Sequence, residues 1–550
     1  MIKNVKIIWC LLIAIILLAG ILRLWQLGSI PPSPDWDEVA LGYSAYSILH
    51  TGRDEFGKFL PVVLRSFDDY KPALYAYITV PSVLIFGLDV FAVRLPSAII
   101  GTLTTLLVFY LVRKIFEKYK YRDYLSLTSA FLFAISPWSI QFSRVAFESN
   151  IGVTLNALVV LFFLKGLKKP WMLSLSALFA GLCIYAYQSE KVFTPLLVLS
   201  MIIIYRKRLG SLSKKYIIYP LVVGLIIVLP MILYIATNRE ALLRVTGTSI
   251  FSYQTELLKS NLPKIERDKI SNDNLGLIFD NRRLTYFKTI VSGYVSHFDL
   301  NWLFVKGDIS RHHAPSMGLL YLFELPFIVL GIYMLIFGEF QKSKKYLIFS
   351  WFLLAAIPAS VTVGVPHAVR TLNFLPTYQI LSAIGLVSFL IYVNRFKRAK
   401  YAAHLVLTVF SCLNFSYYLN QYFVQLNYFD SSEWQYGYKQ AVAEAASLGD
   451  RYSKVIVSDR QPMDKSYMFF LFYLKYPPSD YQKIGMFSSG GYAVHHSFGK
   501  YSFRPIDWDK DSKEKNSLLI GTPSEIPNGA PVLETIYNLD GSEAIRIVGT

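Results

Sequence analysis

The stretch that decides the fold is the first apolar run, residues 7–27, with the sequence IIWCLLIAIILLAGILRLWQL and a single charged residue, Arg23. A helix needs about 20 apolar residues to cross the hydrocarbon core of a bilayer. Basic residues precede the run, and no small-residue cleavage motif follows it. We therefore interpret it as an uncleaved first membrane span and not as a signal peptide.

The same criterion, applied along the rest of the chain, predicts an all-α polytopic membrane protein. The 550 residues are 54% hydrophobic and 17% charged, with a mean hydropathy of +0.40, which is typical of a protein whose main solvent is lipid. About eleven spans are expected, at residues 7–27, 91–113, 124–141, 150–166, 171–187, 192–206, 216–236, 318–338, 346–363, 371–393 and 401–423.

The basic residues predict the orientation of these spans. The formal net charge is +18, but the lysines and arginines lie in short clusters between apolar runs. This pattern excludes nucleic-acid binding and fits the cytoplasmic loops of a multi-pass plasma-membrane protein that obeys the positive-inside rule. With a cytoplasmic N-terminus, all of these clusters fall inside: Arg113–Lys114, Lys165–Lys168–Lys169, Arg206–Lys207–Arg208, Lys342–Lys344–Lys345 and Arg395–Lys397–Arg398.

The outer side then carries a long first loop at 28–90, a polar loop at 237–317 and the tail. We predict a transmembrane domain at 1–423 and an extracytoplasmic α/β domain at 424–550. The tail contains a helical stretch, SSEWQYGYKQAVAEAASL, and the strand-like runs KVIVSD, NSLLIGTP and EAIRIVG. In the first loop, segments 38–50 and 70–86 have amphipathic patterns that predict helices lying in the membrane interface.

Three carboxylates in the first outer loop form the leading candidate site. The sequence PDWDE places Asp35, Asp37 and Glu38 shortly after the first span. A carboxylate can act as general base on an acceptor hydroxyl, and such a cluster can also hold a divalent cation. The alternative is local, with Asp37 capping the helix expected at 38–50 and Glu38 favoured by the helix dipole.

Cations on the same predicted face are candidates for binding a phosphate. Lys71, close to Tyr75 and Tyr77, can hold a lipid phosphate as a point charge, or its stem lies along the interface with the ammonium in the headgroups. Arg94 can add a second cation, or it pairs with a carboxylate of the outer loop.

Two more constellations lie at predicted outer boundaries. Arg144 and Glu148 are one helical turn apart, so they would share a helix face, either in a site or as a plain intrahelical ion pair. In the short loop PHAVR, His367 and Arg370 can face one site. The planar fork of an arginine suits a phosphate, although Arg370 can also simply anchor its span in the headgroup layer.

A histidine-rich segment precedes the expected span at 318–338. It contains His297, Asp308, Arg311, His312 and His313. Adjacent histidines in a polar loop are more often solvated than bound to metal, so we predict no zinc site from them.

The candidate residues all fall on one predicted side of the membrane, and few charges lie inside the spans. A transporter would instead place its ionisable residues near the midplane of the bilayer. The distribution of charge therefore favours chemistry at the outer surface.

Several longer motifs carry a family resemblance. They are PDWDEVALGYSAYSIL, TGRDEFGKFLP, YKPALYAY, FAVRLPSAIIG, GDISRHHAPSMGLLYLFELPFIVLGIY and VPHAVRTLNFLP, all within residues 1–400. These runs resemble the lipid-linked-sugar glycosyltransferases of the GT-C fold. The resemblance is greatest to relatives of the dolichyl-phosphate-mannose:protein mannosyltransferases and the lipid A aminoarabinose transferases, and it does not extend to the tail.

The resemblance implies a role for each matching acid. Asp37, from the Asp-Glu motif of the first loop, would be the general base on the acceptor, and Glu38 would support it. Glu148 matches a second acid of the family in position only, because many relatives have Asp there.

The resemblance also implies a phosphate site. Lys71, from the Lys-Pro motif, would contact the carrier phosphate, and His367 and Arg370 would complete its site. Arg94 and Arg144 are added as candidate phosphate-binding cations because of their position on the predicted outer face.

The reaction expected of such a protein moves a sugar from a dolichyl or undecaprenyl phosphate to a hydroxyl group of a protein, a lipid or a glycan. Direct displacement at the anomeric carbon needs one base and no enzyme nucleophile, so inversion is expected. The donor itself does not require a metal. If a divalent cation is used, its candidate ligands are Asp35, Asp37 and Glu38.

Two alternatives stay open at this stage. One is a non-enzymatic transporter or a scaffold subunit of envelope-polymer assembly. The other is an oligosaccharyltransferase or polymer ligase, which would use the same architecture to move a preassembled chain from a diphosphate carrier. The sequence identifies neither the sugar nor the acceptor.

Overall fold

The computed structural model describes residues 5–67, 69–238, 247–252, 255–448, 451–484 and 496–550. Contacts between Cα atoms divide the chain into two units. Unit 1 is Met1–Leu18, Leu103–Ser139 and Ser149–Phe415, and unit 2 is Ala19–Thr102, Ile140–Glu148 and Ser416–Thr550. These units differ from the predicted domains 1–423 and 424–550, because the first outer loop groups with the tail.

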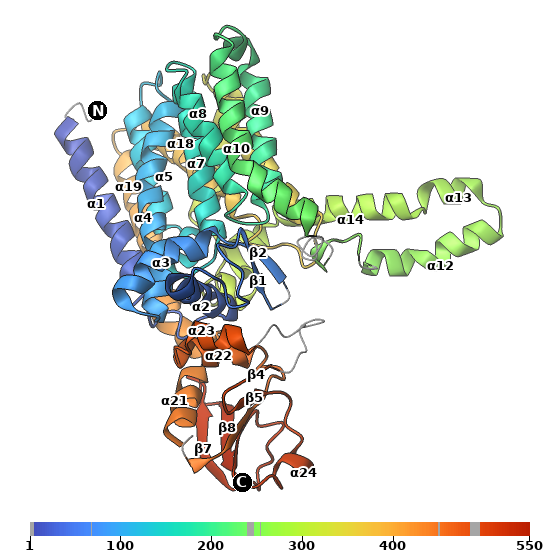
Figure 1. Cartoon of the computed structure of the whole chain (residues 1–550). Coiled ribbons are helices and arrows are strands. Elements are labelled where there is room, and N and C mark those ends of the chain that lie inside the picture. Colours follow the sequence, from blue (N-terminus) through green and yellow to red (C-terminus); the bar gives the residue numbers. More distant parts are fainter. Residues whose placement is uncertain (1–4, 68, 239–246, 253–254, 449–450, 485–495) are drawn as a thin grey trace. The chain divides into compact units, whose positions relative to one another are not determined.

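Helices make up most of the chain (Figure 1). Those that lie in unit 1 or cross its boundary are α1 Val5–Leu24, α4 Val90–Ile115, α5 Arg122–Ile135, α6 Pro137–Arg144, α7 Ser149–Gly166, α8 Met172–Cys183, α9 Glu190–Gly210, α10 Lys215–Thr237, α12 Glu256–Ile270, α13 Asn274–Phe279, α14 Arg282–Ser296, α15 Glu324–Phe337, α16 Lys342–Leu354, α17 Ile357–Ser360, α18 Thr377–Val393 and α19 Ala399–Asn420.

Six helices of the described chain are both long and apolar enough to cross a membrane: α1, α4, α7, α10 and the helical stretches at 372–393 and 399–429. The pair α5 and α6, bent by 55°, can count as a seventh span. The other four expected spans fall on α8, α9, α15 and α16. Of these, α8 and α15 are apolar but only 12 and 14 residues long. Hydropathy therefore locates the helical segments, but only six or seven of the eleven have both the length and the apolar composition of a complete span.

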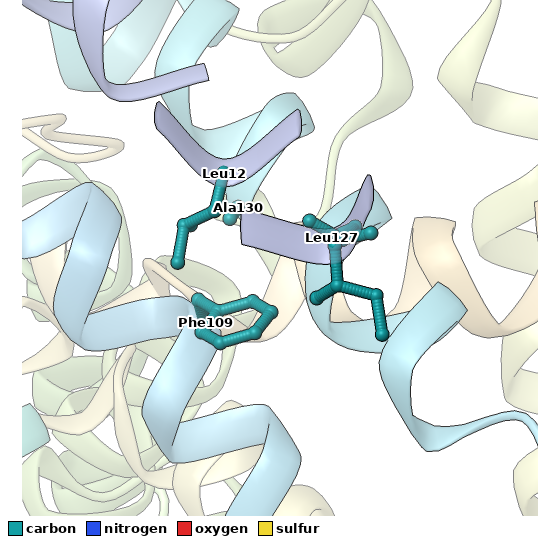
Figure 2. Packing of buried hydrophobic residues seen from close by; sticks show 5 residues of the cluster. Leu12, Phe109, Leu127 and Ala130 are labelled. Carbon is teal, nitrogen blue, oxygen red and sulfur yellow. The ribbon is translucent and has the colours of Figure 1, made fainter. Parts of the chain in front are cut away.

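Small residues bring two helices of unit 1 into close contact. A Cβ on Gly331 of α15 would lie 1.9 Å from the carbonyl oxygen of Leu381 in α18, and one on Gly385 would lie 1.9 Å from that of Phe327. Close backbone approach through small residues is a common way for membrane helices to associate. A separate apolar cluster joins α1, α4 and α5 (Figure 2), formed by Ile8, Leu12, Phe109, Leu127 and Ala130.

Unit 2 is built around α2, Trp36–Thr51. This helix packs on α3 (Leu74–Phe86), α22 (Ser466–Tyr473) and α23 (Pro478–Lys483). The approach to α22 is possible because Gly42 has no Cβ, which would lie 2.8 Å from the ring of Phe472. Most of α2 is buried on all sides, so the prediction of an interfacial amphipathic helix at 38–50 is wrong.

The second helix expected in the first loop, at 70–86, starts later than predicted. Residues Asp69–Pro72 form strand β2, which pairs antiparallel with β1, Val63–Ser66, and helix α3 begins only at Leu74. The exposed apolar side chains Leu84, Ile85 and Phe86 lie at its C-terminal end.

The tail forms the predicted α/β structure within unit 2. Its sheet has the strand order β4-β5-β3-β6-β8-β7, and β3 runs parallel to both β5 and β6. Helix α21 (Tyr438–Leu448) and strands β3, β6 and β8 lie within the four runs predicted from the sequence. The bounds of the other elements are α20 Leu426–Phe429, α24 Trp508–Asp511, β3 Lys454–Val457, β4 His496–Phe498, β5 Tyr501–Phe503, β6 Ser517–Gly521, β7 Val532–Tyr537 and β8 Glu543–Gly549.

Candidate active site

The N-terminus of α2 is closed by a capping box. The side chain of Asp35 accepts a hydrogen bond from the backbone N–H of Asp37 at 2.7 Å, and the backbone N–H of Asp35 donates to Oε2 of Glu38 at 3.0 Å. Two N–H groups at the helix end are satisfied in this way. The cap is therefore Asp35 and not Asp37, which corrects the local alternative drawn from the sequence.

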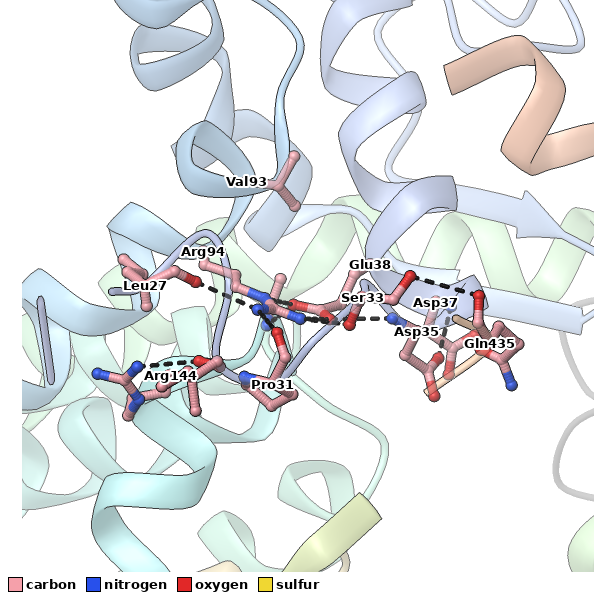
Figure 3. A network of polar contacts seen from close by, with 12 residues as sticks. Leu27, Pro31, Ser33, Asp35, Asp37, Glu38, Val93, Arg94, Arg144 and Gln435 are labelled. Carbon is pink, nitrogen blue, oxygen red and sulfur yellow. Dashed lines mark hydrogen bonds and ion pairs between the residues drawn. The ribbon is translucent and has the colours of Figure 1, made fainter. Parts of the chain in front are cut away.

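Glu38 is fully enclosed in a network of donors (Figure 3). Its Oε1 accepts from Nε of Arg94 at 2.9 Å and from the backbone N–H of Ala146 at 2.8 Å. Its Oε2 accepts from Nη2 of Arg94 at 2.9 Å and from Asp35. A buried carboxylate with this many donors is locked in position, so Glu38 is built to orient the first turn of α2.

Arg94, from α4, donates its remaining hydrogen bonds to the backbone of the segment that precedes α2. Nη1 donates to the carbonyl oxygens of Leu27 at 3.1 Å and Pro31 at 2.9 Å, and Nη2 donates to that of Ser33 at 2.7 Å. With the two bonds to Glu38, all five N–H groups of the guanidinium have acceptors. No donor is left for a phosphate, so the geometry does not support Arg94 as a phosphate ligand and gives it a positioning role.

Arg144 holds the same segment from another side. Its guanidinium donates to the carbonyl oxygens of Leu22 and Ile30, both at 2.9 Å, and lies over the ring of Phe423. Helix α6 ends at Arg144 and α7 begins at Ser149, so Arg144 and Glu148 do not share a helix face as predicted. Arg144 too is fully buried, and its two Nη groups donate to backbone carbonyl oxygens.

Asp37 and Lys71 form the ion pair at the centre of the site. Lys71 lies on β2 opposite Leu64 of β1, and its ammonium contacts a carboxylate oxygen of Asp37. The lysine side chain is 7% exposed and that of Asp37 is 31% exposed, so the carboxylate is the accessible partner. Burial lowers the pKa of Lys71, but the charges of Asp37 and Glu148 raise it by more.

Glu148 is a second acid beside this pair. It is buried, and burial raises its pKa to about 7, with Lys71 opposing the shift and Asp37 and Asp35 adding to it. One buried ammonium is therefore surrounded by the fields of three carboxyl groups, one of which titrates near neutral pH. The structure brings together Asp37, Lys71 and Glu148 within unit 2, and their roles in catalysis stay a prediction.

The histidine-rich segment of unit 1 builds a different site. Asp308, His312 and His367 each offer a ligand atom, and these atoms lie within 4.8 Å of one another. Nδ1 of His312 is 2.8 Å from Oδ2 of Asp308, which also accepts from the backbone N–H of Ala368 at 2.6 Å. Two imidazoles and one carboxylate suit Zn²⁺. The sequence indicated solvated histidines without a zinc site, whereas in the structure His312 is buried and forms a candidate metal-binding group with Asp308 and His367.

The surroundings of His367 fit such a role. Its Nδ1 is buried and has no hydrogen-bond partner in the described part of the chain, while its backbone N–H donates to Nε2 of His297 at 3.2 Å. Burial lowers the pKa of His367 well below its usual value, which keeps the imidazole neutral as a metal ligand must be. Among the described residues, the acids Asp35, Asp37 and Glu38 do not form a group of this kind.

Arg370 is held by its own loop. Its Nη1 donates to the hydroxyl of Thr362 at 2.6 Å and to the carbonyl oxygen of Val363 at 2.7 Å. The participation of His367 and Arg370 in a phosphate site stays a prediction from the sequence.

Sequence reasoning set aside one group of residues and missed another. Asp308 and His312 were set aside, because they become informative only when His367 from another loop joins them. The other is Lys465 of the tail, whose ammonium lies 3.6 Å from the ring centre of Trp36, next to Asp37. No local pattern marks Lys465, because its importance comes from the packing of the tail on the first loop.

Comparison with known sequences supports the resemblance in part of the chain. The profile of a family described as dolichyl-phosphate-mannose-protein mannosyltransferase matches residues 70–234. A comparison with curated proteins finds no match.

Comparison with solved structures extends over the whole chain. ArnT from Cupriavidus metallidurans bound to undecaprenyl phosphate is 13% identical, with a TM-score of 0.51, and the match covers 99% of this chain and 98% of ArnT. The apo form of ArnT gives 14% identity, a TM-score of 0.52 and the same coverage.

An archaeal oligosaccharyltransferase gives a weaker match. AglB from Archaeoglobus fulgidus, in complex with an inhibitory peptide and a dolichol-phosphate, is 13% identical with a TM-score of 0.49. The match covers 85% of this chain, and the chain spans 63% of the length of AglB. The match to ArnT establishes the fold, because it covers nearly the whole length of both proteins.

Proposed function

Because the chain has the GT-C fold of multi-pass membrane glycosyltransferases, we propose that it moves a sugar from a polyprenyl phosphate to an acceptor hydroxyl. The contact of Asp37 with Lys71, beside Glu148, carries this proposal. It supplies a base and a phosphate-binding cation side by side, which are the two groups that the reaction needs. ArnT, which shares the fold, was solved with undecaprenyl phosphate, and this supports the class of donor.

The ion pair provides a way to couple donor binding to catalysis. The donor phosphate is an anion that competes with Asp37 for the ammonium of Lys71. Once the phosphate holds Lys71, the carboxylate of Asp37 loses its cation and becomes a stronger base. The base is thus activated when the donor is in place.

The chemical step is then a single displacement. Asp37 takes the proton of the acceptor hydroxyl as the hydroxyl oxygen attacks the anomeric carbon. The bond between the anomeric carbon and the phosphate oxygen breaks, and the phosphate leaves with the electron pair, its added charge stabilised by Lys71. One displacement inverts the anomeric centre.

Other residues of unit 2 keep this geometry in place. Glu38 and Arg94 hold the first turn of α2, from which the side chain of Asp37 projects. In this proposal the first loop and the tail lie outside the membrane, and the N-terminus lies in the cytoplasm, as the positive-inside rule predicts.

Transfer of radiolabelled sugar tests the proposal. Wild type, Asp37→Asn and Lys71→Met, purified into detergent, receive a panel of polyprenyl-phosphate sugars and an extract of cell envelopes. We expect wild type to label an acceptor and Asp37→Asn to be slower by about 10²–10⁴-fold, the usual effect of removing a general base. Asp480→Asn is the matched control, because Asp480 pairs with Lys483 and both side chains are exposed.

The outcomes separate the alternatives. An active Asp37→Asn would remove Asp37 as the base, and retained anomeric configuration in the product would exclude single displacement. If wild type turns over no donor of the panel while remaining folded, the transporter or scaffold hypothesis becomes the better one.

A further inference from the structure

Lys465 of the tail has an unusual place in unit 2. It directly precedes α22 and adopts a left-handed backbone conformation with φ of 65°, which is uncommon for a residue other than glycine, asparagine or aspartate. Its side chain is only 14% exposed. A long cationic side chain on a protein surface would normally extend into water.

The ammonium of Lys465 rests on aromatic rings from the two chain segments that carry the active pair. It lies 3.6 Å from the ring centre of Trp36, which directly precedes Asp37, and 5.4 Å from that of Phe67, which lies shortly before Lys71 in the chain. The ammonium also pairs with a carboxylate oxygen of Asp464, at 3.5 Å. Cation–π contacts of this kind add to the ion pair with Asp464 in holding the ammonium in place.

The electric field at Lys465 connects it with the active pair. Burial lowers its pKa, the charges of Asp464, Asp37 and Asp35 oppose this shift, and the charge of Lys71 adds to it. Lys465 lies on Trp36 and Lys71 contacts the adjacent residue Asp37, so both ammonium groups stand beside the first turn of α2. Both ammonium groups lie in the field of Asp37, so a phosphate that displaces this carboxylate from Lys71 meets a second cation in the same surroundings.

We propose that Lys465 is a second ligand of the carrier phosphate, so that the tail completes the donor site formed by the first outer loop. This inference rests on the proposed function. The donor is a phosphate diester with one negative charge, whereas the departing polyprenyl phosphate is a monoester with about −1.5 to −2 at neutral pH. A second cation therefore acts most strongly as the bond to the sugar breaks, where it accelerates the reaction.

The flexible stem of lysine suits this task. Its ammonium lies over the rings of Trp36 and Phe67, and rotation about the bonds of the four-carbon chain can move it from the ring face to a phosphate oxygen. Tyr467, in the first turn of α22, packs edge-on against Phe67 with ring centres 6.0 Å apart and so fixes this end of the tail on the first loop.

Binding of undecaprenyl phosphate tests the proposal without turnover. Radiolabelled undecaprenyl phosphate is titrated into full-length wild type, Lys465→Met, Lys465→Arg and Lys510→Met in nanodiscs. Losing a charge-assisted hydrogen bond is expected to weaken binding by about 10- to 100-fold in Lys465→Met. Arginine is expected to restore most of the affinity. Lys510, which is 83% exposed and pairs with Asp507, is the matched control and should bind like wild type.

A second arm distinguishes the lipid-linked phosphate from free phosphate. Inorganic phosphate is added as competitor, and the proposal predicts displacement of the lipid only at concentrations far above that of the lipid. Displacement at equal concentration would overturn the assignment to the lipid carrier.

The two proposals fail in different ways. If Lys465→Met binds undecaprenyl phosphate as tightly as wild type, the proposed role of Lys465 is overturned, even if sugar transfer is lost. Wild type that binds no undecaprenyl phosphate, and no dolichyl phosphate in a parallel titration, overturns the proposed function and this inference together.

Discussion

Arg94→Met is expected to destabilise unit 2 by about 3–5 kcal/mol, the usual cost of removing one partner of a buried ion pair. Arg94 and Glu38 are 0% and 1% exposed in their side chains, so water cannot replace the lost contact. The substitution leaves the carboxylate of Glu38 with two backbone donors, from Ala146 and Asp35. Three carbonyl groups of the segment before α2 lose their donor as well.

A double-mutant cycle gives the contribution of the pair itself. Glu38→Gln alone leaves a buried, unpaired guanidinium, and Glu38→Gln with Arg94→Met removes both charges. We expect the double variant to lose less free energy of unfolding than the two single variants together, by about 1–3 kcal/mol, the usual coupling energy of contacting residues. Because Glu38 positions the turn that carries Asp37, both single variants are also expected to lower sugar transfer.

The free energy of unfolding is measured by SDS titration in mixed micelles, with limited proteolysis as a second probe. Arg504→Met serves as control, because Arg504 also pairs with a carboxylate, Asp511 at 2.6 Å, but is 24% exposed in its side chain. That pair is expected to contribute about 1 kcal/mol or less. The reasoning would be refuted if Arg94→Met lowered the free energy of unfolding no more than Arg504→Met does. It would also be refuted if the losses of the two single variants simply added in the double variant.

Three further predictions concern other parts of the chain. The pKa of Glu148 is about 7, so its carboxylate forms as the pH rises above neutral and competes with the donor phosphate for Lys71. The KM for the donor should therefore rise above pH 7 in wild type and stay constant in Glu148→Gln. Equal pH profiles of KM in the two proteins would contradict this prediction. Zinc should raise the Tm of wild type and leave that of His312→Ala unchanged, since a metal that binds only the folded state stabilises it; equal shifts in both proteins would argue against the site. Gly331→Ala should cost about 1–3 kcal/mol by overpacking, because its Cβ would lie 1.9 Å from a backbone oxygen of α18; a Tm like that of Gly224→Ala, where the nearest atom is 3.9 Å away, would show that the helices separate easily.

The local part of the site was predictable from the sequence. Asp35, Asp37 and Glu38 stand together in the chain, and a capping box needs only residues three apart, so the start of α2 was foreseen within a few residues. Lys71 was also identified, although it lies on a strand and not on the predicted helix. Such features depend on neighbours in the chain, which a single sequence displays directly.

The roles of the arginines were not predictable in the same way. Arg94 and Arg144 stand at predicted outer boundaries, where a cation suggests a phosphate ligand. Their donors meet backbone carbonyl groups of residues 22–33, and which acceptors lie within reach depends on how α4 and α6 pack. The pairing of His312 with His367 likewise depends on two loops that the chain separates by several helices.

By itself, the sequence determined that this is a polytopic helical membrane protein with an acidic first loop and an α/β tail, because hydropathy, charge clusters and strand patterns are local quantities. The tertiary structure decided which ionisable groups are buried and hydrogen-bonded to the backbone, and which stay accessible. It buried Glu38, Arg94 and Arg144, left Asp37 accessible on Lys71, and brought Lys465 over Trp36. The physical reason is that desolvation and hydrogen-bond partners are set by distant segments, and these two effects decide what a charged side chain can do.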